Sequence, residues 1–280
     1  NVGVWPATGG SAEAMLATGP LTRRAEDLMP LLRILAGVEA PAGASTPGHG
    51  GALGDPAAVS LDGLLVTTVE GASRRPMSRS LRDARERAAG ALASAGARLR
   101  TVNLPSWRDA MLPFLAMLQD NGGTDPRATR ALLVEAGAPP LGWRQLMFGS
   151  GSHTLPTRLT LMAEALPSSP KARQRLIARG HQLAQELEEA MAGGVLLHPA
   201  HLTPAPRHRR TYGRPWLTTP ASIFNIAGVP VTEVPLGLSP QGLPVGVQVA
   251  APHGADHLSI AIALELEAVF GGWVMPPGID

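Results

Sequence analysis

Ser168-Ser169-Pro170-Lys171 combines residue types that could form a covalent catalyst, because it places two hydroxyls beside the only lysine of the chain. A serine–lysine pair works as nucleophile and base only when burial keeps the lysine neutral. Lys171, however, falls in the first turn of a predicted helix, next to Arg173 and Arg175. We therefore predict a solvated helix start at this position and not a catalytic dyad.

Three histidines form a second candidate group, His198, His201 and His208. A helix could present two histidines on one face to a metal ion, but Pro199 and Pro204 exclude a helix here. No carboxylate lies close to them in the sequence, and the chain has no cysteine. We therefore expect neither a metal nor a cofactor.

Other motifs of enzymes and nucleic-acid-binding proteins are absent or weak. The stretch 149–153 lacks the G-x-S-x-G spacing of a hydrolase nucleophile, and the arginines of 207–214 are expected to lie in a solvated loop. The formal net charge is only +2, and the pI of about 9.9 arises because few groups titrate between neutrality and arginine. The sequence therefore predicts no nucleic-acid partner.

The composition is that of a folded domain. The chain has 280 residues, of which 44% are hydrophobic, so a buried core is expected. No run approaches the roughly 18 uninterrupted apolar residues that span a membrane, and residues 1–6 do not resemble a signal peptide. We expect a cytoplasmic protein. Because residue 1 is not methionine, we also expect either processing or the downstream part of a longer protein.

Helical and strand-like periods alternate along the chain, which predicts an α/β fold. The first helix is expected over 23–36, with Thr22 as N-cap and a kink at Pro30. Its buried stripe would be Leu28, Leu31, Leu32 and Leu35. Further helices are predicted over 79–95, 170–191 and 256–270, the last with Asp256 as N-cap and Ala268 inside, and strands over 61–70, 97–104, 195–198, 229–235 and 244–251.

Several stretches together resemble the amidase signature family. Residues 18–28, TGPLTRRAEDL, are similar to its G-P-x-x-R-x-x-x-D-L stretch, and residues 225–231, NIAGVPV, to its N-x-x-G-x-P stretch. Residues 234–238, VPLGL, and 242–249, GLPVGVQV, are similar to two stretches near the end of the family's sequences, v-P-x-G-l and G-L-P-x-G-x-Q. The stretches 197–206 and 270–274 most resemble the fatty-acid amide hydrolase branch of the second type.

This resemblance implies an α/β/α fold with a large mixed sheet, of which residues 1–280 would be a single partial domain, the C-terminal portion. Family members hydrolyse amides with a lysine and two serines, all of which precede the G-P-x-x-R stretch. The stretch begins here at Gly19. The resemblance thus implies that the catalytic part is absent and that the chain alone is inactive. Gly9-Gly10-Ser11-Ala12 lies too close to this stretch to be the nucleophile loop.

The function that follows from the resemblance is hydrolysis of a small-molecule carboxamide, such as a fatty-acid-type amide, by a parent serine amidase. We predict that Leu217, Thr219, Ile223 and Phe224 build part of its acyl channel. Thr219-Pro220 suits a helix start, and core packing explains the large apolar residues equally well. Two alternatives stay open: the amidase subunit of a glutamine-dependent amidotransferase, and a truncated, non-catalytic ligand-binding chain. The expected form of self-assembly is a homodimer.

Overall fold

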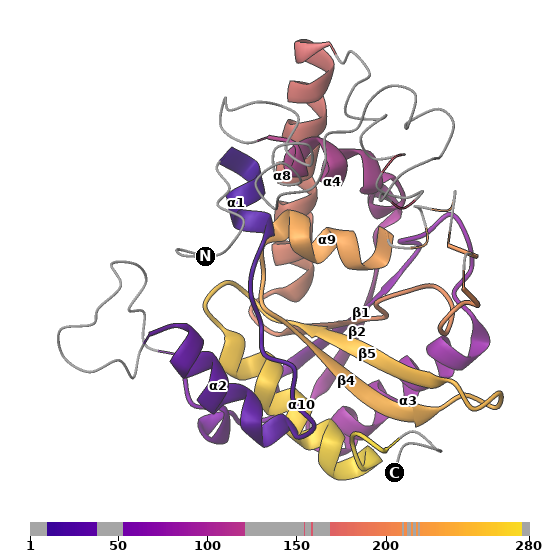
Figure 1. The fold of residues 1–280 in the computed structure, drawn as a ribbon. Coiled ribbons are helices and arrows are strands. Elements are labelled where there is room, and N and C mark those ends of the chain that lie inside the picture. Colours follow the sequence, from indigo (N-terminus) through magenta and orange to yellow (C-terminus); the bar gives the residue numbers. More distant parts are fainter. Residues whose placement is uncertain are drawn as a thin grey trace.

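A five-stranded mixed sheet lies between two layers of helices (Figure 1). The computed structural model describes residues 10–37, 53–120, 154, 158, 169–208, 210, 211, 214, 217 and 219–275. The strands are β1 (Leu65–Glu70), β2 (Arg98–Asn103), β3 (Val195–His198), β4 (Val231–Leu238) and β5 (Pro244–Ala250). The α-helices are α1 (Gly10–Met15), α2 (Leu28–Leu35), α3 (Arg79–Ser94), α4 (Met111–Leu118), α8 (Pro170–Met191), α9 (Thr219–Ala227) and α10 (Asp256–Phe270). Short 3-10 helices cover Ala25–Asp27, Pro56–Ala58 and Pro105–Asp109.

The strand order, β2-β1-β3-β5-β4, joins a parallel half to an antiparallel half. β1 is parallel to β2 and β3, whereas β5 is antiparallel to β3 and β4. β1, α3 and β2 follow one another as a parallel strand–helix–strand unit, and β4 and β5 form an antiparallel pair. The α/β class is therefore confirmed, and the pairing changes direction at β3.

Alternation along the strands decides which helices cover each face of the sheet. On β3, Leu197 belongs to the core shared with α3 and α10, and Leu196 to the core shared with α8 and α9. The core with α3 contains Leu81, Ala84, Ala88 and Leu92, the apolar residues of that helix at helical spacing. The apolar residues of α8 at helical spacing are Leu176, Ile177, Leu183, Leu187 and Met191, of which the last three are buried in the other core and the first two are half-buried.

The first predicted helix differs from the structure in its start and in its burial. α2 begins only at Leu28, and the hydroxyl of Thr22 donates to the carbonyl of Arg24 (2.7 Å) instead of capping the helix. Pro30 falls in the first turn, where its missing N–H has no intrahelical partner, so the helix continues through it. The buried stripe is wrong, because Leu31 and Leu35 are 40% and 52% exposed.

The C-terminal elements show smaller differences from the predictions. α10 has the predicted bounds, but Asp256 is its first residue, and Ala255 occupies the N-cap position without a side-chain hydrogen bond. Ala268 is exposed instead of buried. β4 begins at Val231 and continues to Leu238, so both of its ends lie further along the chain than predicted.

Apolar side chains on α2 and the open edge of β4 predict that the isolated chain self-associates. From the sequence, the apolar strands 229–235 and 244–251 are the ones expected to form an unpaired edge. Among the described residues β4 pairs only with β5, and β5 lies between β3 and β4, so of these two only β4 has an open edge. Leu31, Ile34 and Leu35 are all well exposed. Unpaired strand edges and exposed apolar patches promote association. We expect concentration-dependent oligomers in sedimentation velocity, and a smaller oligomeric fraction in Ile34→Lys than in the control Arg33→Lys. A monomer at every concentration would contradict this.

Candidate functional site

A cavity of about 640 Å³ lies where three segments that are distant in sequence meet. Its walls are the segment 17–25, the turn from α9 into β4, and α10. The stretches 18–28 and 225–231, which resemble the amidase signature family, supply much of the first two walls. The cavity is therefore the candidate functional site.

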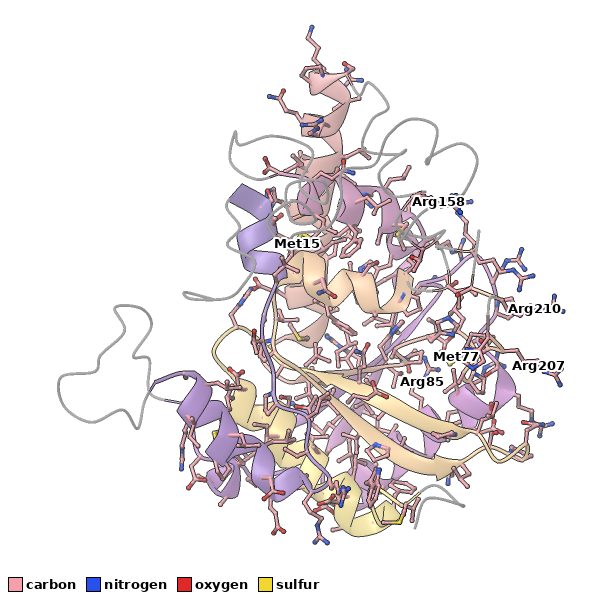
Figure 2. The ribbon with its side chains drawn as sticks, viewed as in Figure 1. Met15, Met77, Arg85, Arg158, Arg207 and Arg210 are labelled. Atoms are coloured by element: carbon pink, nitrogen blue, oxygen red, sulfur yellow. The ribbon has the colours of Figure 1, made fainter. Side chains whose placement is uncertain are left out.

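Contacts at both of its ends hold the segment 17–25 in place. Upstream, the side-chain amide of Asn225 on α9 donates to the carbonyl of Met15 (3.2 Å), at the end of α1 (Figure 2). Downstream, the N–H of Ala25 donates to Glu267 of α10 (3.1 Å). The segment thus bridges the helical layers on opposite sides of the sheet, and the cavity lies beneath it.

A row of polar side chains crosses the sheet face toward α9 and ends in this cavity. His198 of β3 is the register partner of Gln248 of β5, and Gln248 is the partner of Glu233 of β4. Directly opposed residues of antiparallel strands point to the same face. Gln248 and Glu233 line the cavity. Gly246 leaves room for this carboxylate, because a Cβ there would lie 2.5 Å from Glu233 Oε1.

His198 forms the buried end of the row and is only 3% exposed. Its Nδ1 donates to the carbonyl of Pro199 (3.0 Å), and its ring makes edge contacts with Trp107 and Phe224, each at a centroid distance of 6.0 Å. Desolvation by burial lowers the pKa of His198 to about 4, although the hydrogen bond to Pro199 acts in the opposite direction. The imidazole is therefore neutral at pH 7 and packs as an aromatic ring.

Glu233 forms the end of the row that lies in the cavity. Desolvation raises the pKa of Glu233 to about 7, and no cation of the described residues pairs with this carboxylate. Much of the Glu233 side chain is exposed to solvent, so screening weakens the effect of this shift on stability. On the next strand, Gln248 Oε1 is buried and receives no hydrogen bond from the described residues.

The four residues predicted to form an acyl channel lie in different surroundings. Phe224 lines the cavity and is also part of the core, whereas Ile223 is 1% exposed and packs only in the core toward α8. Thr219, at the start of α9, is buried, and its carbonyl accepts a hydrogen bond from Ser222 (2.8 Å). Leu217 is half-buried and, like Thr219, lies outside the cavity lining. Their role in substrate binding stays a prediction, and the position of Ile223 favours core packing, the alternative left open by the sequence.

The predicted serine and lysine candidates lie away from the cavity. Lys171 and Ser169 are exposed at the start of α8, the surroundings that the sequence predicts for them. Ser168 and the stretch 149–153 lie outside the described residues. Nothing in the described part of α8 brings Lys171 near a buried hydroxyl.

The histidine and arginine groups also lie apart from one another. His201 is half-buried and hydrogen-bonded to Thr203, unlike the fully buried His198, and no three potential metal ligands converge anywhere in the described ranges. Arg207 and Arg210 are exposed and extend from the molecule (Figure 2). Within the same ranges, no helix is both long enough and apolar enough to cross a membrane.

Glu233 and the pairing of Gln248 were missed by the sequence analysis. A signal was present, because Glu233 is the one charged residue of an otherwise largely apolar strand, β4. Gln248 entered only as a letter of a family stretch. Their proximity depends on the register of β4 against β5, which sequence spacing alone does not give.

Comparisons with known proteins give one consistent result. The family model named Amidase matches residues 3–259. Fatty-acid amide hydrolase 2-B of Danio rerio is 35% identical over 99% of this chain and 52% of its own length, and fatty-acid amide hydrolase 2 of Homo sapiens is 34% identical over the same shares. The solved 6-aminohexanoate cyclic dimer hydrolase shares the fold, with a TM-score of 0.68 and 17% identity over 89% of this chain and 54% of that one. The chain thus spans about half the length of the curated relatives it matches.

Proposed function

We propose that this chain, which belongs to the amidase family, is the C-terminal part of a serine amidase. The whole enzyme would hydrolyse carboxamides through an acyl-enzyme. The observation that carries the proposal is the alignment with fatty-acid amide hydrolase 2-B, which extends over 99% of this chain. A fatty-acid-type amide is the proposed substrate class, because the named relatives act on such amides. As a single partial domain, the chain would shape the substrate site without supplying its nucleophile.

The positions of the lysine and histidine residues support a chain that contributes to substrate binding and does not supply the catalytic groups. Lys171, the only lysine, is exposed on α8, and the buried imidazole of His198 is neutral and packed between rings. The lysine and serines of the family's reaction would therefore come from residues outside this chain. The cavity between the segment 17–25, α9 and α10 would hold part of the substrate. A cytoplasmic location and a homodimer accompany this proposal as predictions.

Restoring an upstream half tests the proposed function. The upstream half of the zebrafish fatty-acid amide hydrolase 2-B is joined to this chain in place of that enzyme's own C-terminal half. We expect hydrolysis of a long-chain acyl anilide and labelling by a fluorophosphonate in the chimera. The isolated chain should show neither. A chimera that folds cooperatively but is inactive would contradict the proposal, and labelling of the isolated chain would contradict the placement of the nucleophile.

A further inference from the structure

Two hydrogen-bond acceptors in the cavity have no donor among the described residues. Gln248 Oε1 is buried without a hydrogen bond, and the Glu233 carboxylate forms no ion pair. A buried acceptor without a partner loses the hydrogen bonds that water would give it, which destabilises the folded chain. This applies to Gln248 Oε1, whereas Glu233 is an exposed residue whose carboxylate water can reach. The two residues are register partners on neighbouring strands, so the two acceptors lie side by side.

The cations at the mouth of the cavity are held elsewhere. The guanidinium of Arg23 lies over the ring of Trp273, 4.7 Å from its centroid. Arg24 lies within ion-pair distance of Glu267 (3.9 Å) and Glu26 (3.7 Å). Glu267 also accepts the N–H of Ala25, so this acid already has its partners. Glu233 and Asp256 are thus the acidic residues of the lining that form no ion pair within the described structure, and of these two only Glu233 stands beside Gln248 on the sheet.

The spacing and the walls define what would fit between the two acceptors. Side chains opposite each other on antiparallel strands have Cβ atoms about 4.5–5.5 Å apart, a separation that one nitrogen with several N–H groups can bridge. Gly246 lets the Glu233 carboxylate lie against β5, because a Cβ at this position would be 2.5 Å from Glu233 Oε1. Phe224, Val231 and Ile260 line the same cavity and offer apolar surface. The site is therefore shaped for a positively charged donor attached to an apolar chain.

We propose that this cavity binds a cationic nitrogen, an alkylammonium group, between the Glu233 carboxylate and Gln248 Oε1. The ammonium donates to both acceptors, and its alkyl chain packs against Phe224. Desolvation disfavours the Glu233 anion in the empty cavity, and a bound cation removes this penalty. The inference concerns binding only and does not depend on hydrolysis. If the proposed amidase function also holds, the ammonium belongs to the part of the substrate that lies over β4 and β5.

Calorimetric titration of the chain with n-butylammonium chloride, and with n-butanol as a neutral ligand of similar shape, tests the proposal. We expect saturable binding of the ammonium and at least about tenfold weaker binding of the alcohol. Glu233→Gln and Gln248→Met should each weaken ammonium binding by roughly tenfold or more. Glu265→Gln, which removes the same charge from α10 outside the cavity lining, should leave it unchanged. Equal affinity for the two ligands, or no effect of either cavity variant, would overturn the proposal.

A measurement on the unchanged chain covers the case in which a variant fails to fold. The pKa of Glu233 is followed by carbon-detected NMR with and without saturating butylammonium. A bound cation should lower this pKa, and butanol should not. An unchanged pKa at saturation, or no saturable binding up to about 100 mM ammonium, would overturn the proposal. Neither experiment depends on catalysis, so its failure leaves the chimera test of the proposed function intact.

Discussion

Ile223→Ala is expected to lower the free energy of unfolding by about 2–5 kcal/mol and to leave acyl-chain selectivity unchanged. Ile223 is 1% exposed and packs in the core between the sheet and α8, outside the cavity lining. Removing its side chain leaves a void that the close-packed surroundings fill only in part. Urea unfolding of the chain measures the loss of stability. The ratio of kcat/KM for short and long acyl amides in the chimera measures selectivity.

Phe224→Ala is the matched variant on the same helix. Phe224 is also buried, at 3% exposed, but it lines the cavity, so its removal should destabilise the chain and also shift acyl selectivity. The expected shift is about 1–3 kcal/mol in relative kcat/KM at most. Ile262→Ala, in the core on the opposite face of the sheet, controls for stability loss alone. A larger selectivity change in Ile223→Ala than in Phe224→Ala would reverse the assignment of these two residues.

Local signals were sufficient for most elements of the fold. α8 and β3 have the predicted bounds, because apolar residues at helical spacing mark α8 and Pro199 marks the end of β3. α3 buries the predicted face for the same reason. The prediction failed on α2, whose leucines have helical spacing but little to pack against among the described residues. Periodicity shows which side of a helix can be buried, whereas burial itself depends on a neighbouring element.

The candidate site depends on contacts that no local signal contains. The hydrogen bond from Ala25 to Glu267 joins residues 242 positions apart, and it helps to close one wall of the cavity. The row from His198 through Gln248 to Glu233 depends on the register of three strands. The family stretches marked the right parts of the chain, but not which side chains face the cavity. Ile223 and Phe224 are adjacent in sequence, and only the structure separates their surroundings.

His198 and Glu233, at the two ends of this row, are expected to give opposite pH dependences of the free energy of unfolding. His198 has a folded-state pKa of about 4 against an ordinary 6.5, so the unfolded chain binds the proton first as the pH falls. Its contribution therefore favours the folded state above about pH 6.5 and is lost progressively down to pH 4, on the order of 3 kcal/mol in total. Glu233 has a raised pKa, from 4.5 to about 7, so the folded chain holds its proton longer as the pH rises. Its contribution is present below about pH 4.5 and is lost as the pH rises toward 7.

Between about pH 5 and 6.5 these two contributions oppose each other, and single variants should separate them. In Glu233→Gln, of these two contributions only that of His198 remains, so the free energy of unfolding should rise more steeply with pH than in the unchanged chain. His198→Phe keeps a ring between Trp107 and Phe224, and of the two contributions only that of Glu233 remains. The slope of the free energy of unfolding against pH should therefore decrease or become negative. Urea unfolding at closely spaced pH values measures these slopes, and Glu265→Gln serves as the control for loss of one carboxylate. A steeper rise in His198→Phe than in Glu233→Gln would show that the buried imidazole is not the group that protonates on unfolding.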